Sequence, residues 1–215
     1  MATGRKLIND CLRSPLASHG WTPRAAGWFT TDLTPGHLGV IAVGTATEHA
    51  ATGTAQATLY VHLRDEAVER DVSALCQLEP QSYRDTTAVT SIGHLMPEHH
   101  WHEWLVTPDT ARTVAAEMAD AAITYAKPHL LRLTREPSLL LDTVKGSPSF
   151  SGALGMCRAV VLLAHMGDVP GAQGLLNEQL GLIGSRNDAA ALSQRQVGQA
   201  LQIWLAPRAA GTPPF

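Results

Sequence analysis

The chain has 215 residues, and 45% of them are hydrophobic, a proportion typical of a globular protein rather than of a disordered chain. Its 16 basic and 19 acidic residues give a formal charge of −3, which argues against a general nucleic-acid binder because such proteins usually carry a basic stripe. No apolar run reaches the roughly 20 residues of a membrane-spanning helix, and the first residues lack the apolar segment of a secretory signal. We therefore expect a cytoplasmic protein with no membrane partner.

The first part of the chain predicts a helix followed by strands. Apolar residues fall at helical spacing over residues 5–19, where Pro15 is expected to kink or restart the helix. Two short runs, 27–33 and 37–45, have strand character and are separated by the turn sequence Thr-Pro-Gly at 34–36.

Residues 55–64 give the clearest strand pattern in the chain. Ala57, Leu59, Val61 and Leu63 alternate with polar or aromatic residues. Such a period of two predicts a strand with one buried and one wet face, which is typical of an antiparallel sheet.

Helices and strands alternate over the next segment. Residues 65–78 predict a helix capped by Asp65, and two strands are expected at 86–95 and 102–107. An Ala-rich helix at 111–126 follows, and Pro128 is expected to end it.

The end of the chain predicts helices alone. Shorter helices are expected within 130–144, and three more follow the Gly/Ser/Pro-rich segment 146–152, which reads as a linker. The first two of these three resemble one helical-hairpin unit of the tetratricopeptide kind, too few for an independent solenoid. We therefore predict an α+β domain over 1–145, with an antiparallel sheet of about four to five strands packed against helices, then the linker, a helical appendage at 153–206 and a flexible tail at 207–215.

Several motifs resemble a known family. The sequence CLRSPLASHGW at 11–21, GWFTTD at 27–32, IGHL at 92–95 and WHEW at 101–104 are similar to the bacterial α+β domain-of-unknown-function family numbered forty-three zero four. The similarity covers roughly residues 5–145. It implies no known activity and no catalytic residue; because some such proteins lie near polymorphic toxin genes, it implies an immunity-like, protein-binding role.

A histidine-rich segment at 93–104 is the main candidate for chemistry. His100 and His102 would share one face of an extended chain, and His94 or Glu98 could complete the ligands of a divalent metal with an open position. Such a site would make the protein a metal-dependent enzyme, hydrolytic or oxygen-using, and this is the alternative interpretation. The expected form of the segment is a solvated or interface loop, and a buried, hydrogen-bonded histidine is a further alternative.

The same segment carries two tryptophans. Trp101 and Trp104 would either cover the edge of the core or, with the histidines beside them, form an anchor for a partner, since Trp is frequent at interface hot spots. The residues assigned to such a binding site are His99, His100, Trp101, His102 and Trp104.

Other patterns carry less chemistry. Segment 146–152 lacks the glycine spacing of a serine nucleophile elbow, and no phosphate-binding loop is present. A basic group at 127–135 reads as a solvated helix face or as a site for an acidic partner. The three cysteines, Cys11, Cys76 and Cys157, are far apart and suggest neither a disulfide framework nor a zinc site; Cys76 and Cys157 are expected to be inert small hydrophobic side chains.

From these observations we expect a non-enzymatic binding protein that meets another protein through its sheet or its histidine- and tryptophan-rich segment. A metal-dependent enzyme and a small-ligand binding protein that uses the face of the sheet are the alternatives. The sequence leaves the identity of the partner and the oligomeric state open.

Overall fold

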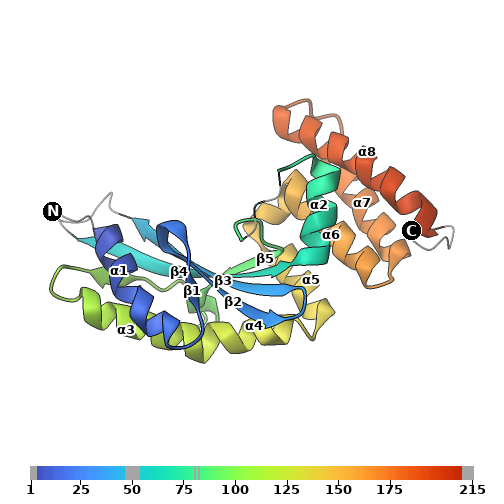
Figure 1. Cartoon of the computed structure of the whole chain (residues 1–215). Coiled ribbons are helices and arrows are strands. Elements are labelled where there is room, and N and C mark those ends of the chain that lie inside the picture. The colour runs from blue at the N-terminus through green and yellow to red at the C-terminus, as the bar shows by residue number, and fades with distance from the viewer. Residues whose placement is uncertain (1–3, 47–53, 80, 82, 210–215) are drawn as a thin grey trace. The chain divides into compact units, whose positions relative to one another are not determined.

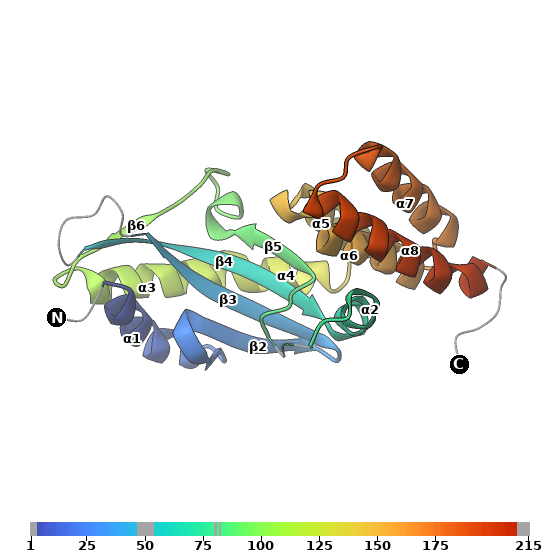
Figure 2. The ribbon, with the colours of Figure 1, turned by 90° about the horizontal axis from the view of Figure 1, so that it is seen from above.

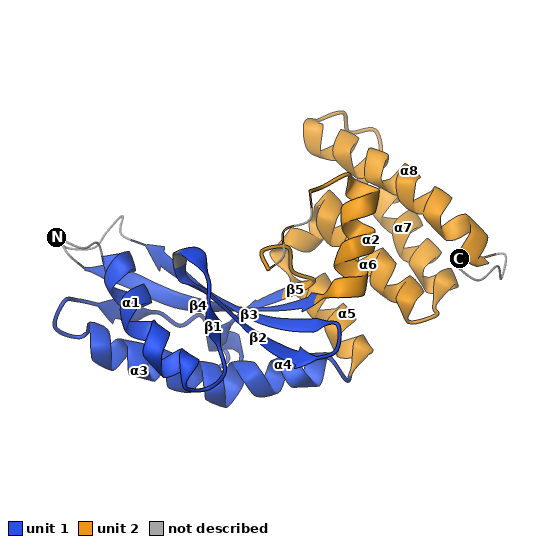
Figure 3. Cartoon of the chain, in the orientation of Figure 1, with its two compact units in different colours: residues 1–64, 89–135 blue, residues 65–88, 136–215 orange. Residues whose placement is uncertain are grey.

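The computed structural model describes residues 4–46, 54–79, 81 and 83–209 (Figure 1). The chain divides into two compact units, one formed by residues 1–64 and 89–135 and the other by residues 65–88 and 136–215 (Figure 3). The predicted α+β class is confirmed, with an antiparallel sheet and a helical C-terminal region. The boundary differs from the expected one, because segment 146–152 lies inside the second unit and residues 65–88 belong with the C-terminal helices.

The sheet has six strands among the described residues. The strands follow the order β1-β2-β3-β4-β5, and β6 also pairs with β4. Figure 2 shows β5 and β6 along one edge of β4, with β3 along the other. Their bounds are β1 (Thr22–Pro23), β2 (Trp28–Thr34), β3 (His37–Ala46), β4 (Ala55–Asp65), β5 (Ala88–Ser91) and β6 (Trp104–Val106).

One face of the sheet is covered by helices, as the alternation in β4 predicts. Leu59, Val61 and Leu63 are at most 1% exposed on this face. Helix α1 (Gly4–Ala17) packs against α3 (Ala111–Ala121), and α4 (Lys127–Leu133) packs against β2 (Figure 1). The polar and aromatic residues of β4 therefore lie on the opposite face.

Two strands are shorter than expected. The predicted strand 86–95 is extended only over Ala88–Ser91, after which Ile92–His94 form a 3₁₀ turn. The predicted strand 102–107 is reduced to Trp104–Val106. The residues between β5 and β6 therefore form a loop.

The expectation that Pro128 ends the Ala-rich helix is wrong. Helix α3 continues through a π-helical turn at Ala122–Ala126 into α4. In this turn the Lys127 amide donates to the carbonyl of Ala122, five residues back. A proline lacks an amide and clashes with the carbonyl four residues before it, and a π turn displaces that carbonyl, so the chain passes Pro128 without a break. Pro15 likewise lies inside α1.

His129 of α4 makes the stability of the first unit dependent on pH. Its Nε2 is buried and has no hydrogen-bond partner among the described residues. Burial, and secondly the charge of Arg132, lower the pKa of His129 below its ordinary value of 6.5. Because the unfolded chain then binds the proton more readily than the folded one, His129 costs stability as the pH falls through 6.5 and on toward the folded-state pKa.

We expect the His129→Gln variant to lose less stability than the wild type between about pH 7.5 and about pH 5. Thermal denaturation measured across this range checks the difference. His19→Gln, which changes an exposed histidine of the same unit, is the control and should keep the wild-type slope. Equal slopes for the His129→Gln variant and the wild type would contradict the assignment.

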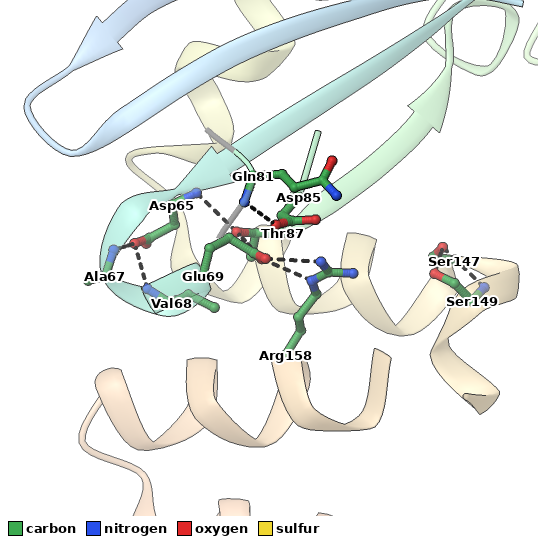
Figure 4. Close-up of polar contacts among 10 residues, drawn as sticks. All are labelled: Asp65, Ala67, Val68, Glu69, Gln81, Asp85, Thr87, Ser147, Ser149 and Arg158. Carbon is green, nitrogen blue, oxygen red and sulfur yellow. Dashed lines mark hydrogen bonds and ion pairs between the residues drawn. The ribbon is translucent and has the colours of Figure 1, made fainter. Parts of the chain in front are cut away.

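The second unit is helical, and α6 lies at its centre. Helix α6 packs against four other helices, and the side chains of Met156, Val160 and Val161 are fully buried. The Asp65 carboxylate caps α2 by accepting from the amides of Ala67 and Val68, as predicted (Figure 4). The helices are α2 (Glu66–Cys76), α5 (Pro137–Gly146), α6 (Ala153–His165), α7 (Val169–Ile183) and α8 (Ala189–Ala209).

Two segments expected to be irregular are ordered in part. Residues 207–209 of the predicted tail are the last turn of α8, and 210–215 lie outside the described residues. Within the predicted linker, Pro148–Ser151 form a 3₁₀ turn that packs against Gly155 of α6 so closely that a Cβ there would overlap the Ser149 carbonyl oxygen. The segment is therefore part of the packed helical unit rather than a spacer.

Candidate functional site

The histidine-rich segment forms a loop between β5 and β6, which we call the His/Trp loop (residues 93–103). Both flanking strands pair with β4, so the two ends of the loop are fixed to the same strand. The Thr58 hydroxyl of β4 donates to the carbonyl oxygen of His102 over 2.8 Å. This bond ties the base of the loop to the sheet.

Gly93 closes the base of the loop from the other side. A Cβ built on Gly93 would overlap the His100 carbonyl oxygen and lie 2.7 Å from the His102 amide nitrogen. Backbone atoms of one end of the loop therefore touch the other end at a distance that only glycine allows. The loop is held at its base by both a hydrogen bond and backbone contact.

The histidines of the loop point to different partners. His99 Nδ1 lies 3.1 Å from the His94 carbonyl oxygen, and His100 Nδ1 lies 2.7 Å from the carbonyl oxygen of Trp101. His102 packs edge-on against the Trp104 ring, with ring centroids 4.4 Å apart. The first two contacts are to backbone carbonyls, so the rings help to fix the shape of the loop.

The predicted metal ligands His94, Glu98, His100 and His102 are not brought together. Among the described residues there is no group of three or more His, Cys, Asp or Glu side chains placed to hold a metal ion. One predicted ligand, His100, has its Nδ1 engaged with a main-chain carbonyl. A divalent metal at this position stays a prediction from sequence.

The two tryptophans have different surroundings. Trp104 is 7% exposed and shares the buried face of β6 with Val106, so it covers the edge of the core. Trp101 is 46% exposed, and its ring contacts that of Tyr60, with centroids 5.9 Å apart. Of the pair, Trp101 is therefore the one whose ring a partner could reach.

Tyr60 belongs to a line of rings across the open face of the sheet, which we call the aromatic row (Trp28, His62, Tyr60 and Trp101). Trp28 lies 5.4 Å from His62, and His62 lies 6.5 Å from Tyr60, between ring centroids. Gly44 of β3 leaves room for this row, because a Cβ there would lie 2.6 Å from a Tyr60 ring carbon. The row was not predicted, although the alternation in β4 places Tyr60 and His62 on one face.

Leu105 lies on the same face as the aromatic row. Leu105 pairs with Gln56 of β4, and Gln56 lies on the same face of β4 as Tyr60 and His62, because every second residue of a strand faces the same side. The Leu105 side chain is 61% exposed. Among the described residues of the first unit, the large hydrophobic side chains that are exposed to solvent are those of Trp101 and Leu105. The face therefore carries two exposed apolar side chains next to the His/Trp loop.

The basic group at 127–135 and the serine-containing segment 146–152 offer fewer features of a functional site. Lys127 of the basic group donates to the His19 carbonyl oxygen over 3.4 Å, while Arg132 and Arg135 are exposed. Ser147 and Ser149 hydrogen-bond to each other over 2.8 Å (Figure 4), beside an open pocket of about 530 Å³. The described residues that line this pocket carry no ionisable side chain.

None of the helices in the described part of the chain combines the length and apolar character needed to cross a membrane. Comparison of the chain with family models, with curated proteins and with solved structures gave no match. The resemblance to the domain-of-unknown-function family therefore stays an expectation from the quoted motifs.

Proposed function

We propose that the protein is a non-catalytic binding protein that docks another protein on the face formed by Trp101, Leu105 and Tyr60. The observation that carries this proposal is that Trp101 and Leu105, the exposed large apolar side chains in the described part of the first unit, lie on the same side of the sheet. Exposed apolar side chains that gather on one face mark interaction sites more often than scattered ones do.

The anchoring of the His/Trp loop supports the same proposal. A rigid aromatic side chain loses little conformational entropy on binding, and Trp is enriched at interface hot spots. Trp101 has such rigidity, because its ring rests on Tyr60 and the backbone beside it is fixed by Thr58 and Gly93. The exposed side chains of His94, His99 and Glu103 supply polar groups for the rim of the interface.

The partner we propose is a protein with an apolar pocket that accepts an indole ring. The narrower form of the proposal is an immunity-like role in which this partner is a toxin protein, and only the family resemblance supports it. In either form the docking surface is the same.

We expect Trp101→Ala to weaken binding of the partner by roughly 10- to 100-fold, since truncating a hot-spot aromatic costs about 2 kcal/mol or more. Proteins captured by the immobilised wild-type chain but lost with Trp101→Ala are the candidates. Calorimetric titration of each candidate then measures its affinity. Leu105→Ala should weaken binding to a smaller extent.

Leu182→Ala is the matched control, because Leu182 is a 70% exposed apolar side chain of the second unit. It should leave the affinity unchanged, and circular dichroism should show all variants folded. A partner that binds the Trp101→Ala/Leu105→Ala double variant with wild-type affinity would remove this face as the docking surface.

A second candidate function, binding of a small planar ligand, is favoured by the aromatic row. Rings of the row could stack against an aromatic or sugar ring, which is a common use of exposed aromatic side chains. Planar aromatic fragments that shift the NMR signals of Trp28 and His62, but not those of Leu105, would favour this function over protein docking.

A further inference from the structure

Two of the three cysteines meet between helices of the second unit. Cys76 is the last residue of α2, and Cys157 lies in the second turn of α6, which packs against α2. The Cys157 thiol donates a hydrogen bond to the sulfur of Cys76. The two thiols are therefore in contact although 80 residues separate them in the chain.

The two thiols differ in access and in ionisation. Cys157 is fully buried, whereas Cys76 is partly exposed. The hydrogen bond from Cys157 and the positive charge of Arg158 lower the pKa of Cys76, against the opposing effects of burial and of Glu69. The hydrogen bond to Cys76 and burial raise the pKa of Cys157.

Arg158 is fixed beside the pair by Glu69. Its Nε and Nη2 each donate to a Glu69 carboxylate oxygen over 2.9 Å, and the Thr87 hydroxyl donates to the same carboxylate over 3.0 Å (Figure 4). Arg158 is therefore one half of an ion pair near Cys76, and its positive charge lowers the pKa of this thiol by more than the Glu69 carboxylate raises it. A partly exposed cysteine beside a cation and a second thiol is the usual setting of a redox-active cysteine.

We propose that Cys76 and Cys157 form an oxidation site that a hydroperoxide converts into a disulfide between α2 and α6. The Cys76 thiolate attacks one peroxide oxygen, the O–O bond breaks, and the leaving hydroxide takes up a proton to become water, which leaves Cys76 as a sulfenic acid. The sulfur of Cys157 then attacks the sulfur of Cys76, the S–O bond breaks, and hydroxide leaves with the Cys157 proton as a second water. In sum, two thiols are oxidised and one hydrogen peroxide is reduced to two waters.

The test treats the intact reduced chain with one equivalent of hydrogen peroxide. We expect a mass loss of about 2 Da, which corresponds to two hydrogens, and a Cys76–Cys157 cross-linked peptide in the non-reducing digest. The oxidised chain should unfold at a higher temperature than the reduced chain, because the disulfide restricts the unfolded state. Cys11→Ser is the matched control: Cys11 is also partly exposed but lies in the first unit, so the variant should form the disulfide as the wild type does.

Two further variants separate the roles of the thiols. Cys157→Ser should stop the reaction at the sulfenic acid of Cys76, which dimedone captures as a stable adduct, and Cys76→Ser should give no dimedone adduct at Cys157. Cys157→Ala replaces Cys157→Ser if circular dichroism shows that a buried hydroxyl unfolds the chain. Three results with the wild-type chain would overturn the proposal. Cys76 could be captured by dimedone with no disulfide formed, both thiols could remain reduced, or Cys76 could form its disulfide with Cys11 instead of Cys157.

Discussion

Arg158→Met is expected to lower the free energy of unfolding of the second unit by about 3–5 kcal/mol, because it leaves a buried carboxylate without its counter-charge. Glu69 is 1% exposed, and both its oxygens accept from Arg158. The Thr87 hydroxyl also donates to this carboxylate, but a neutral hydroxyl cannot neutralise its charge. Urea denaturation, with hydrogen exchange of the α2 amides as the local readout, measures the loss.

A double-mutant cycle separates the ion pair from the packing of the arginine stem. Glu69→Gln/Arg158→Met should recover much of the stability lost by Arg158→Met alone, since the uncompensated charge is gone. Arg186→Met is the control because the Arg186–Asp188 pair is exposed, with 59% and 49% of the two side chains accessible. This variant should lower the free energy of unfolding by at most about 1 kcal/mol. The explanation fails if Arg158→Met costs no more than this control.

Gly93→Ala is expected to destabilise the first unit by about 2–4 kcal/mol and to displace the His/Trp loop. The added methyl would overlap the His100 carbonyl oxygen and press on the His102 amide. Backbone atoms cannot turn away as the end of a side chain can, so the two ends of the loop must separate. The hydrogen bond from Thr58 to His102 should then be strained or lost.

Thermal denaturation and the NMR signal of the Trp101 indole measure the two effects of Gly93→Ala. Gly174→Ala is the control, because Gly174 is an exposed helical glycine whose added Cβ meets no atom within 4 Å. It should leave the loop unchanged and stabilise the chain by about 0.5–1 kcal/mol. An unshifted Trp101 signal in Gly93→Ala would contradict the role of Gly93 at the base of the loop.

The elements that could be predicted are those whose pattern depends on their own residues. The alternation of β4 follows from the apolar side chains that its helix-covered face buries, and the Asp65 cap follows from two amides that lie beside its carboxylate. The turn at 34–36 was predicted for the same reason, since Gly36 has a φ of +81° that suits glycine. Local chemistry was sufficient in each of these cases.

The features that could not be predicted depend on residues far apart in the chain. The amphipathic pattern of α2 predicts a buried face but not that α6 covers it, so the helix was assigned to the wrong side of the boundary. The contact between Cys76 and Cys157 and the ion pair of Glu69 with Arg158 both depend on that pairing. In the candidate site, Trp101 and Trp104 have similar sequence surroundings, and only the pairing of β6 with β4 decides which of them is buried.

The interleaved division of the chain also affects how the protein can fold during synthesis. Residues 65–88 belong to the second unit, yet the rest of that unit begins at residue 136. Helix α2 therefore leaves the ribosome roughly 80 residues before α6 begins, a delay of about 4–16 s at ~5–20 residues per second. During this interval α6 has not been synthesised and cannot cover the apolar side chains of Val68 and Val72. The nascent chain is therefore a candidate for chaperone binding until α6 emerges.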